Sequence, residues 1–157
     1  YDMAKQSNEN AGMATTVVLL YLVGNYAYVV NVGDSRAYVC RDLKISQITE
    51  DHTFVNELLK GGSITKAQAE YHPNKNMITR ALGGDKIILP DFYRFETYKN
   101  DIIILCTDGL YSELSTDEIC HMASKSNAMC ELSRDLVQRA NQYGGNDNIT
   151  VICLKIQ

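Results

Sequence analysis

The sequence predicts an α+β fold in which two antiparallel β-sheets pack face to face and helices flank them. Apolar runs rich in β-branched residues, such as residues 15–23, are typical of β-strands. Short turn sequences such as Gly24-Asn25 separate neighbouring runs, which indicates hairpins and therefore antiparallel pairing. The helical segments carry apolar residues on one face only, so we expect them to cover the sheets from outside.

The first third of the chain contains four predicted strands in two hairpins, at residues 15–23, 26–32, 36–40 and 44–48. The first of these runs is apolar almost without interruption, so we expect that strand to be buried on both faces. The first hairpin turns at Gly24-Asn25, and the second turns around Arg41-Asp42.

The middle of the chain, residues 49–90, is polar and repeatedly interrupted by glycine and proline. Residues 54–60 predict a short helix that ends at a pair of glycines, and residues 63–71 predict another. In the second helix, Thr65 and Gln68 have the spacing of a capping box. Because this part lacks a long apolar run, we expect it to be mobile or to face a substrate.

The C-terminal part returns to strands and adds longer helices. Residues 91–98 and 101–106 predict two further strands, and residues 149–156 predict the last one. Between them, Ser115 and Glu118 have capping-box spacing ahead of an apolar stretch. A longer amphipathic helix follows, whose apolar face is expected to contain Met129, Leu132, Ser133, Leu136, Val137 and Ala140.

Composition limits the classes of partner. The 157 residues carry a net charge of −4 and no run of basic residues, which argues against nucleic acid or an anionic membrane as a partner. No apolar stretch reaches the roughly 18 residues of a membrane span. The five cysteines show neither C-x-x-C pairs nor zinc-ligand spacing, so they are interpreted as free structural thiols. These features favour a soluble, cytoplasmic protein.

Three aspartates stand where an apolar strand meets a glycine-containing turn. Asp108 follows the strand of residues 101–106, Asp147 precedes the last strand, and Asp34 lies in a Gly-Asp-Ser turn. Carboxylates gathered at one rim of a sheet suit Mg²⁺ or Mn²⁺, which favour oxygen ligands. Aspartate also starts ordinary turns, and the residues alone leave both interpretations open.

Six short motifs occur along the chain in a fixed order: Gly12-Met13-Ala14-Thr15-Thr16, Asn31-Val32-Gly33-Asp34-Ser35-Arg36-Ala37-Tyr38, Thr49-Glu50-Asp51-His52-Thr53, Thr79-Arg80-Ala81-Leu82-Gly83, Leu105-Cys106-Thr107-Asp108-Gly109-Leu110, and Gly144-Gly145-Asn146-Asp147-Asn148-Ile149-Thr150-Val151. In this order and spacing the chain resembles the metal-dependent serine/threonine protein phosphatases of type 2C, the PPM family. It looks most like the compact bacterial members. The resemblance covers nearly the whole chain, from residue 12 to the end.

The resemblance implies one phosphatase-like domain over residues 1–157, with a flap over residues 49–82 beside the catalytic cleft. It also implies a centre of two or three Mn²⁺ or Mg²⁺ ions, with Asp108 and Asp147 as ligands and Asp34 sharing a further ion with Asp108. The nucleophile would be a water molecule that the ions activate, so no catalytic side chain is expected. The implied substrates are proteins phosphorylated on serine or threonine by a cognate kinase.

Two departures from the family pattern bear on activity. Ala14 stands where the family usually has glycine. The family's Asn/Gln-Glu/Asp-Asp and Asp-Gly-Met-Gly-Gly motifs do not occur in the chain. We therefore expect an N-terminally incomplete phosphatase that is inactive alone, and whose exposed sheet edges favour self-association. The alternatives are a non-catalytic phosphatase-like binding or regulatory module, and a structural domain with a single Mg²⁺ or Ca²⁺ ion.

Overall fold

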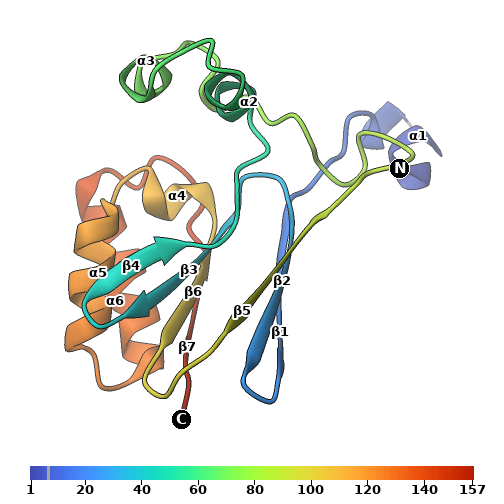
Figure 1. Ribbon diagram of the computed structural model, residues 1–157. Helices are drawn as coiled ribbons and strands as arrows, with labels where there is room; N and C mark the ends of the chain where they lie inside the picture. Colours follow the sequence, from blue (N-terminus) through green and yellow to red (C-terminus); the bar gives the residue numbers. More distant parts are fainter. Residues whose placement is uncertain (7) are drawn as a thin grey trace.

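Two antiparallel sheets pack face to face in the computed structural model, which describes residues 1–6 and 8–157 (Figure 1). The smaller sheet has the strand order β1-β2-β5, with β1 at Val17–Val23, β2 at Tyr26–Val32 and β5 at Asp91–Glu96. The larger sheet has the order β4-β3-β6-β7, with β3 at Arg36–Arg41, β4 at Lys44–Gln47, β6 at Ile102–Cys106 and β7 at Val151–Lys155. All neighbouring strands in both sheets are antiparallel, which confirms the predicted fold class.

Strand β6 lies at the centre of the molecule, and all five of its residues are buried. Its side chains alternate between two hydrophobic clusters, as the period of two in a strand requires. Ile103 and Leu105 pack with Val29 in the cluster between the two sheets. Ile102 and Ile104 belong to the cluster between the larger sheet and the helices. The core of the fold therefore has two layers with β6 between them.

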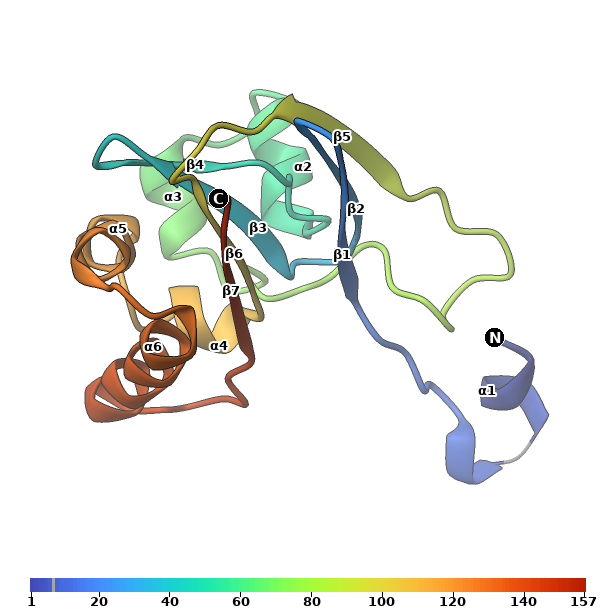
Figure 2. The same cartoon turned by 90° about the horizontal axis from the view of Figure 1, so that it is seen from below.

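Helices cover the outer face of the larger sheet (Figure 2). They are α5 at Thr116–Lys125 and α6 at Met129–Tyr143. The predicted capping box is present at the start of α5, where the Ser115 and Glu118 side chains each accept a hydrogen bond from the other residue's backbone N–H. Helix α6 buries Leu132, Leu136 and Ala140 against the sheet, which confirms its predicted apolar face.

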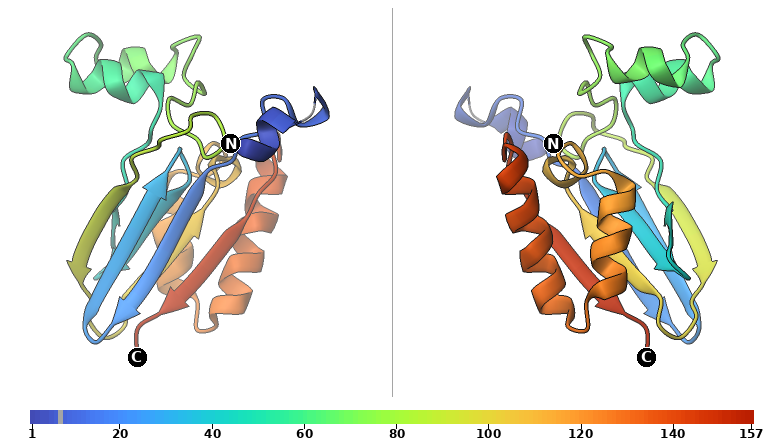
Figure 3. Two further views of the ribbon diagram at one scale, coloured as in Figure 1. Left: turned by 90° about the vertical axis from the view of Figure 1, so that its right-hand side faces the viewer. Right: turned by 90° about the vertical axis from the view of Figure 1, so that its left-hand side faces the viewer.

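The outer face of the smaller sheet is open to solvent along the described part of the chain (Figure 3, left). Large apolar side chains alternate along this face, with Leu19, Tyr21 and Val23 on β1 and further exposed residues at Tyr26, Tyr28 and Phe92. The prediction that the first strand is buried on both faces was therefore wrong. Among the described residues, the long helices α5 and α6 lie over the larger sheet. The apolar composition of residues 15–23 is compatible with a buried strand, but no described helix covers this face of the sheet.

The flap, residues 49–82, extends beyond one end of the two sheets and carries two short helices (Figure 1). Helix α2 spans Phe54–Lys60 and α3 spans Lys66–Glu70, and the predicted capping box of Thr65 and Gln68 is present. We call residues 51–54 and 77–80 the neck of the flap. There the chain enters and leaves side by side, since Phe54 N–H donates to the Met77 carbonyl at 2.9 Å and Thr79 N–H donates to the His52 carbonyl at 2.8 Å.

Three short helical turns were not predicted. They are α1 at Asp2–Gln6, the 3₁₀ turn η1 at Asn8–Asn10, and α4 at Asp108–Tyr111. The first two are short and bury no residue, so the sequence there has no apolar periodicity to detect. Helix α4 begins at the Asp-Gly pair that the sequence suggested as a turn. No described helix is both long enough and apolar enough to cross a membrane.

Candidate metal centre

The loop that carries Asp34 is held in place from several sides. Gly33 has a φ of 106°, and a Cβ there would collide with the Thr16 side chain, so only glycine fits. The Gly33 N–H donates to Nδ1 of His52 at 3.1 Å. The buried Asn31 amide donates to the carbonyls of Gly33 at 3.2 Å and Glu50 at 3.1 Å. These contacts position the turn between β2 and β3, and Asp34 with it.

Asp108 is the first residue of α4, directly after the buried strand β6. Its Oδ1 accepts a hydrogen bond from Gly109 N–H at 3.0 Å. A Cβ on Gly109 would lie 2.5 Å from the Asn148 carbonyl oxygen. This contact is too close for any side chain, so the glycine lets α4 begin against the loop that precedes β7.

Asp147 lies in that loop, four residues before β7, the strand next to β6. The register of β6 and β7 continues past the strands, where Thr107 N–H donates to the Thr150 carbonyl at 3.1 Å and Thr150 N–H donates to Thr107 Oγ1 at 3.0 Å. Strands β6 and β7 are thus neighbours, and Asp108 and Asp147 lie in the segments at the same end of this pair. That both carboxylates reach one ion stays a prediction. Asp147 is exposed, and its Oδ1 accepts from Asn148 N–H at 2.6 Å.

A cleft of about 770 Å³ lies between the flap and the rim of the larger sheet, and Asp34 and Asp108 both line it. Burial raises the pKa of Asp34, and the neighbouring negative charge of Asp108 raises it further. Asp147 is not among the residues that line the cleft. The structure thus brings Asp34 and Asp108 together and leaves Asp147 outside the cleft, in the loop beside α4.

The residues at this rim fit a hard divalent cation. The two cleft carboxylates oppose each other's charge, and a cation between them would remove that conflict. The donors are oxygens, which Mg²⁺ and Mn²⁺ prefer. Along residues 1–6 and 8–157, no three His, Cys, Asp or Glu side chains are grouped closely enough to hold an ion by themselves. An ion here would therefore take part of its coordination from water or from groups beyond these carboxylates.

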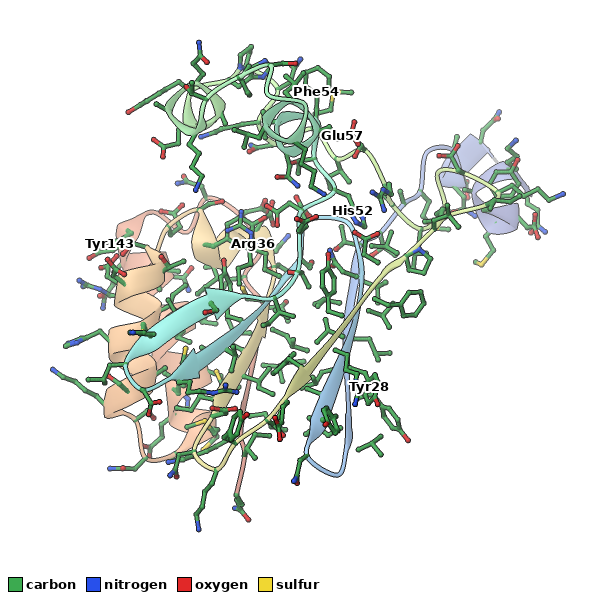
Figure 4. The ribbon with its side chains drawn as sticks, in the orientation of Figure 1. Tyr28, Arg36, His52, Phe54, Glu57 and Tyr143 are labelled. Carbon is green, nitrogen blue, oxygen red and sulfur yellow. The ribbon has the colours of Figure 1, made fainter. Side chains whose placement is uncertain are left out.

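Arg36 forms a network beside the cleft that the sequence did not predict beyond an ordinary salt bridge (Figure 4). Its guanidinium donates to both carboxylate oxygens of Asp51, from Nε at 2.9 Å to Oδ1 and from Nη2 at 2.6 Å to Oδ2. It also donates to the Tyr38 hydroxyl at 2.9 Å and stacks on the Tyr111 ring, 3.4 Å from its centroid. Burial opposes the charge of Arg36, but the hydrogen bonds to Asp51, together with the charge interactions with Asp51, Tyr38 and Tyr111, raise the pKa of the guanidinium.

His52 is buried at the neck of the flap and not at the surface (Figure 4). Because its Nδ1 accepts from Gly33, the proton is on Nε2, which lies 3.1 Å from Asp91 Oδ2. Arg80 also donates to Asp91 at 2.9 Å. Burial alone would raise the pKa of Asp91, but the contacts with His52 and Arg80 lower it. His52 thus has a structural role between the turn of Asp34 and strand β5.

The cysteines offer no nucleophile in the interior. All five are free thiols, as the sequence predicted. Burial raises the pKa of Cys40, Cys106 and Cys153 to about 12, so these side chains remain protonated thiols near neutral pH.

Curated proteins similar to the chain are bacterial phosphatases. Residues 1–58 match the family model described as Protein phosphatase 2C. The chain is 39% identical to protein phosphatase PhpP of Streptococcus pneumoniae over 146 residues, which cover 93% of this chain and 59% of PhpP. It is 36% identical to the serine/threonine phosphatase stp of Listeria monocytogenes over 144 residues, which cover 92% of this chain and 57% of stp.

Solved structures give the same match. The serine/threonine phosphatase of S. agalactiae superposes with a TM-score of 0.96 at 34% identity, covering 100% of this chain and 64% of that one. The catalytic domain of the phosphatase PstP, in a complex with two manganese ions, has a TM-score of 0.84 at 33% identity and covers 97% and 63% of the two chains.

The packed sheets, with helices over the larger one, place the fold in the sandwich class of the solved serine/threonine phosphatases. Within that class, the chain belongs to the protein phosphatase 2C family. It spans 57–61% of the length of the curated relatives that it matches.

Proposed function

We propose that the protein is a metal-dependent phosphatase that hydrolyses phosphoserine and phosphothreonine in other proteins. The observation that carries this proposal is the pair of opposed carboxylates, Asp34 and Asp108, at the floor of a cleft beneath the flap. Relatives of the chain are named protein phosphatases and serine/threonine phosphatases. The manganese ions in the PstP structure support the choice of Mn²⁺ or Mg²⁺.

In this proposal Asp108 and Asp147 hold the two ions, and Asp34 shares a third ion with Asp108. When bound, such ions neutralise the charge of the phosphoryl group and activate water for attack on it. The chain's own residues fix the rim: Gly33 and Gly109 let two loops approach closely, and the loop contacts orient the carboxylates. No side chain of this chain is assigned as the nucleophile.

The proposed partners are phosphorylated proteins together with the serine/threonine kinase that modifies them. We place the protein in the bacterial cytoplasm, because its five free cysteines suit a reducing compartment and its named relatives are bacterial. Self-association through the strand edges at β1 and β7 is a further part of the proposal, since edge strands present unpaired backbone groups.

The second candidate is a phosphatase-like module that binds phosphoproteins without hydrolysing them. The observation that favours it is the donor set, because the described residues hold no group of three metal-ligating side chains.

The test is a Mn²⁺ titration of the full-length protein with p-nitrophenyl phosphate and with a phosphothreonine peptide. We expect Mn²⁺-dependent turnover of both, and Asp108→Asn should lower it at least roughly 100-fold, the upper range for losing a group that only supports a metal ligand. The matched control is Asp135→Asn, at an exposed site on α6, which should keep the original rate. Peptide binding without hydrolysis would favour the second candidate, and equal rates in the two variants would refute the role of Asp108.

A further inference from the structure

Strand β3 has an arginine at each end, and the two arginines make the same kinds of contact. Arg36, its first residue, donates from Nε and Nη2 to both oxygens of Asp51 and stacks on Tyr111. Arg41, its last residue, donates from Nε and Nη2 to the two oxygens of Asp101, each at 2.7 Å. Arg41 also stacks on an aromatic ring, 4.3 Å from the centroid of Tyr98. The chain therefore contains two arginine–aspartate–tyrosine clusters, roughly 16 Å apart along one strand.

The cluster at Arg41 is a local brace. Asp101 and Tyr98 belong to the same turn between β5 and β6, where Tyr98 N–H also donates to Asp101 at 2.8 Å. The cluster lies at the end of the sheets away from the flap (Figure 1). Arg41 thus ties one turn to the end of β3 and touches nothing that lines the cleft.

The cluster at Arg36 joins three separate segments. Asp51 belongs to the neck of the flap, where Asn56 also donates to its backbone carbonyl at 2.8 Å. Tyr111 belongs to α4, the helix that Asp108 begins, and its hydroxyl donates to the Asp34 carbonyl at 2.9 Å. One side chain therefore contacts the base of the flap directly and, through one aromatic ring, both carboxylate-bearing loops.

These contacts require arginine. The planar guanidinium of arginine can bind a carboxylate through two parallel hydrogen bonds while its face stacks on an aromatic ring. The ammonium group of lysine cannot do both. A third donor goes to Tyr38, a fully buried residue of β3, which anchors the cluster to the sheet. Arg36 also lines the cleft, so the side chain that pairs with Asp51 lies beside the rim.

We propose that Arg36 is a positioning residue that couples the flap to the metal rim, so that the flap's placement over the cleft and the placement of Asp34 and Asp108 depend on one another. The inference rests on the proposed phosphatase function for its consequence in catalysis. The coupling itself is a property of the contacts and does not depend on the reaction. Loosening the cluster frees the neck at Asp51 and, through Tyr111, the loops of both carboxylates.

The test compares Arg36→Lys with Arg41→Lys in the full-length protein, because each change removes the same chemistry from one end of β3. Amide exchange across residues 53–77 should speed up about tenfold in Arg36→Lys, equivalent to ~1.4 kcal/mol, and should not change in Arg41→Lys. Calorimetric titration with Mn²⁺ alone should show about tenfold weaker binding in Arg36→Lys only, as for loss of a group that orients a metal ligand.

A second variant, Tyr111→Phe, keeps the ring under Arg36 and removes only the bond to the Asp34 carbonyl. It should weaken Mn²⁺ binding while leaving exchange in the flap unchanged. Equal effects of Arg36→Lys and Arg41→Lys on exchange and on Mn²⁺ binding would overturn the coupling, as would wild-type Mn²⁺ affinity in both Arg36→Lys and Tyr111→Phe. If the wild-type protein fails to hydrolyse p-nitrophenyl phosphate, the proposed function fails, and the exchange comparison still decides the coupling.

Discussion

At the scale of single residues, Asp34 is the clearest case of a candidate ligand whose charge destabilises the folded protein. Its side chain is only 7% exposed and lies near the charge of Asp108, and both factors raise its pKa above the ordinary value of 3.8. A raised pKa means that the folded protein holds the ionised form less readily than the unfolded chain does. Such a carboxylate is expected where a cation, and not the fold, compensates for its charge.

We therefore predict that Asp34→Asn stabilises the protein in EDTA. Asparagine has nearly the same shape without the charge, so the melting temperature should rise by about 2–4 °C, the shift of ~1 kcal/mol in a domain of this size. In saturating Mn²⁺ the wild-type protein should instead have the higher melting temperature, because bound Mn²⁺ stabilises the variant less. Differential scanning calorimetry with and without Mn²⁺ checks both statements. A variant less stable than wild type in EDTA would mean that Asp34 supports the fold.

The sequence revealed the candidate ligands but not what holds them. Asp34, Asp108 and Asp147 could be found because each ends or begins an apolar run beside a glycine, a pattern that is local in the chain. Arg36 could be noted only as one half of a salt bridge, because its partners Asp51 and Tyr111 come from distant segments that meet only in the folded chain.

At the scale of helices and strands, local signals again decided what could be predicted. The two capping boxes and the glycines after α2 predicted three helices, because a helix cap depends on residues that lie within four or five positions of one another in the sequence. Helix α4 has four residues and no side-chain cap, so its formation depends on packing of Leu110 into the core. Whether β1 is covered depends on which other elements lie over its sheet, and no pattern within the strand contains that information.

The flap is the element for which we predict the lowest local stability. Its helices bury a single residue, Ala69, and its neck is held by a few backbone bonds and two ion-paired arginines. Local opening should therefore cost much less there than at the centre of the sheet. Hydrogen exchange followed by mass spectrometry should find residues 53–77 exchanging much faster than β6. Protection of the flap equal to that of β6 would contradict this prediction.

At the scale of the whole molecule, the two sheets differ in how completely they are buried. The larger sheet has the smaller one on one face and α5 and α6 on the other, so β6 lies in a closed core. The smaller sheet exposes a row of large apolar side chains on its outer face, including Tyr21 at 63% and Phe92 at 74%. An apolar face of this kind marks a surface that binds another element or another molecule, and the alternation of residues along β1 and β2 could not say which.

The last prediction concerns a polypeptide of these 157 residues alone. Two-metal catalysis needs both ions held about 3.5–4 Å apart. Of the three proposed ligands, only Asp34 and Asp108 line the cleft, and the described residues contain no group of three metal-ligating side chains. We expect hydrolysis of p-nitrophenyl phosphate in Mn²⁺ to stay close to the uncatalysed rate, although the sheets and α5–α6 are folded. Circular dichroism and amide exchange of β6 establish the fold, and a steady-state assay measures the rate. The control is the phosphatase PhpP of S. pneumoniae, of which the aligned part of this chain covers 59%. Equal turnover by the two would show that the 157 residues contain a complete catalytic centre.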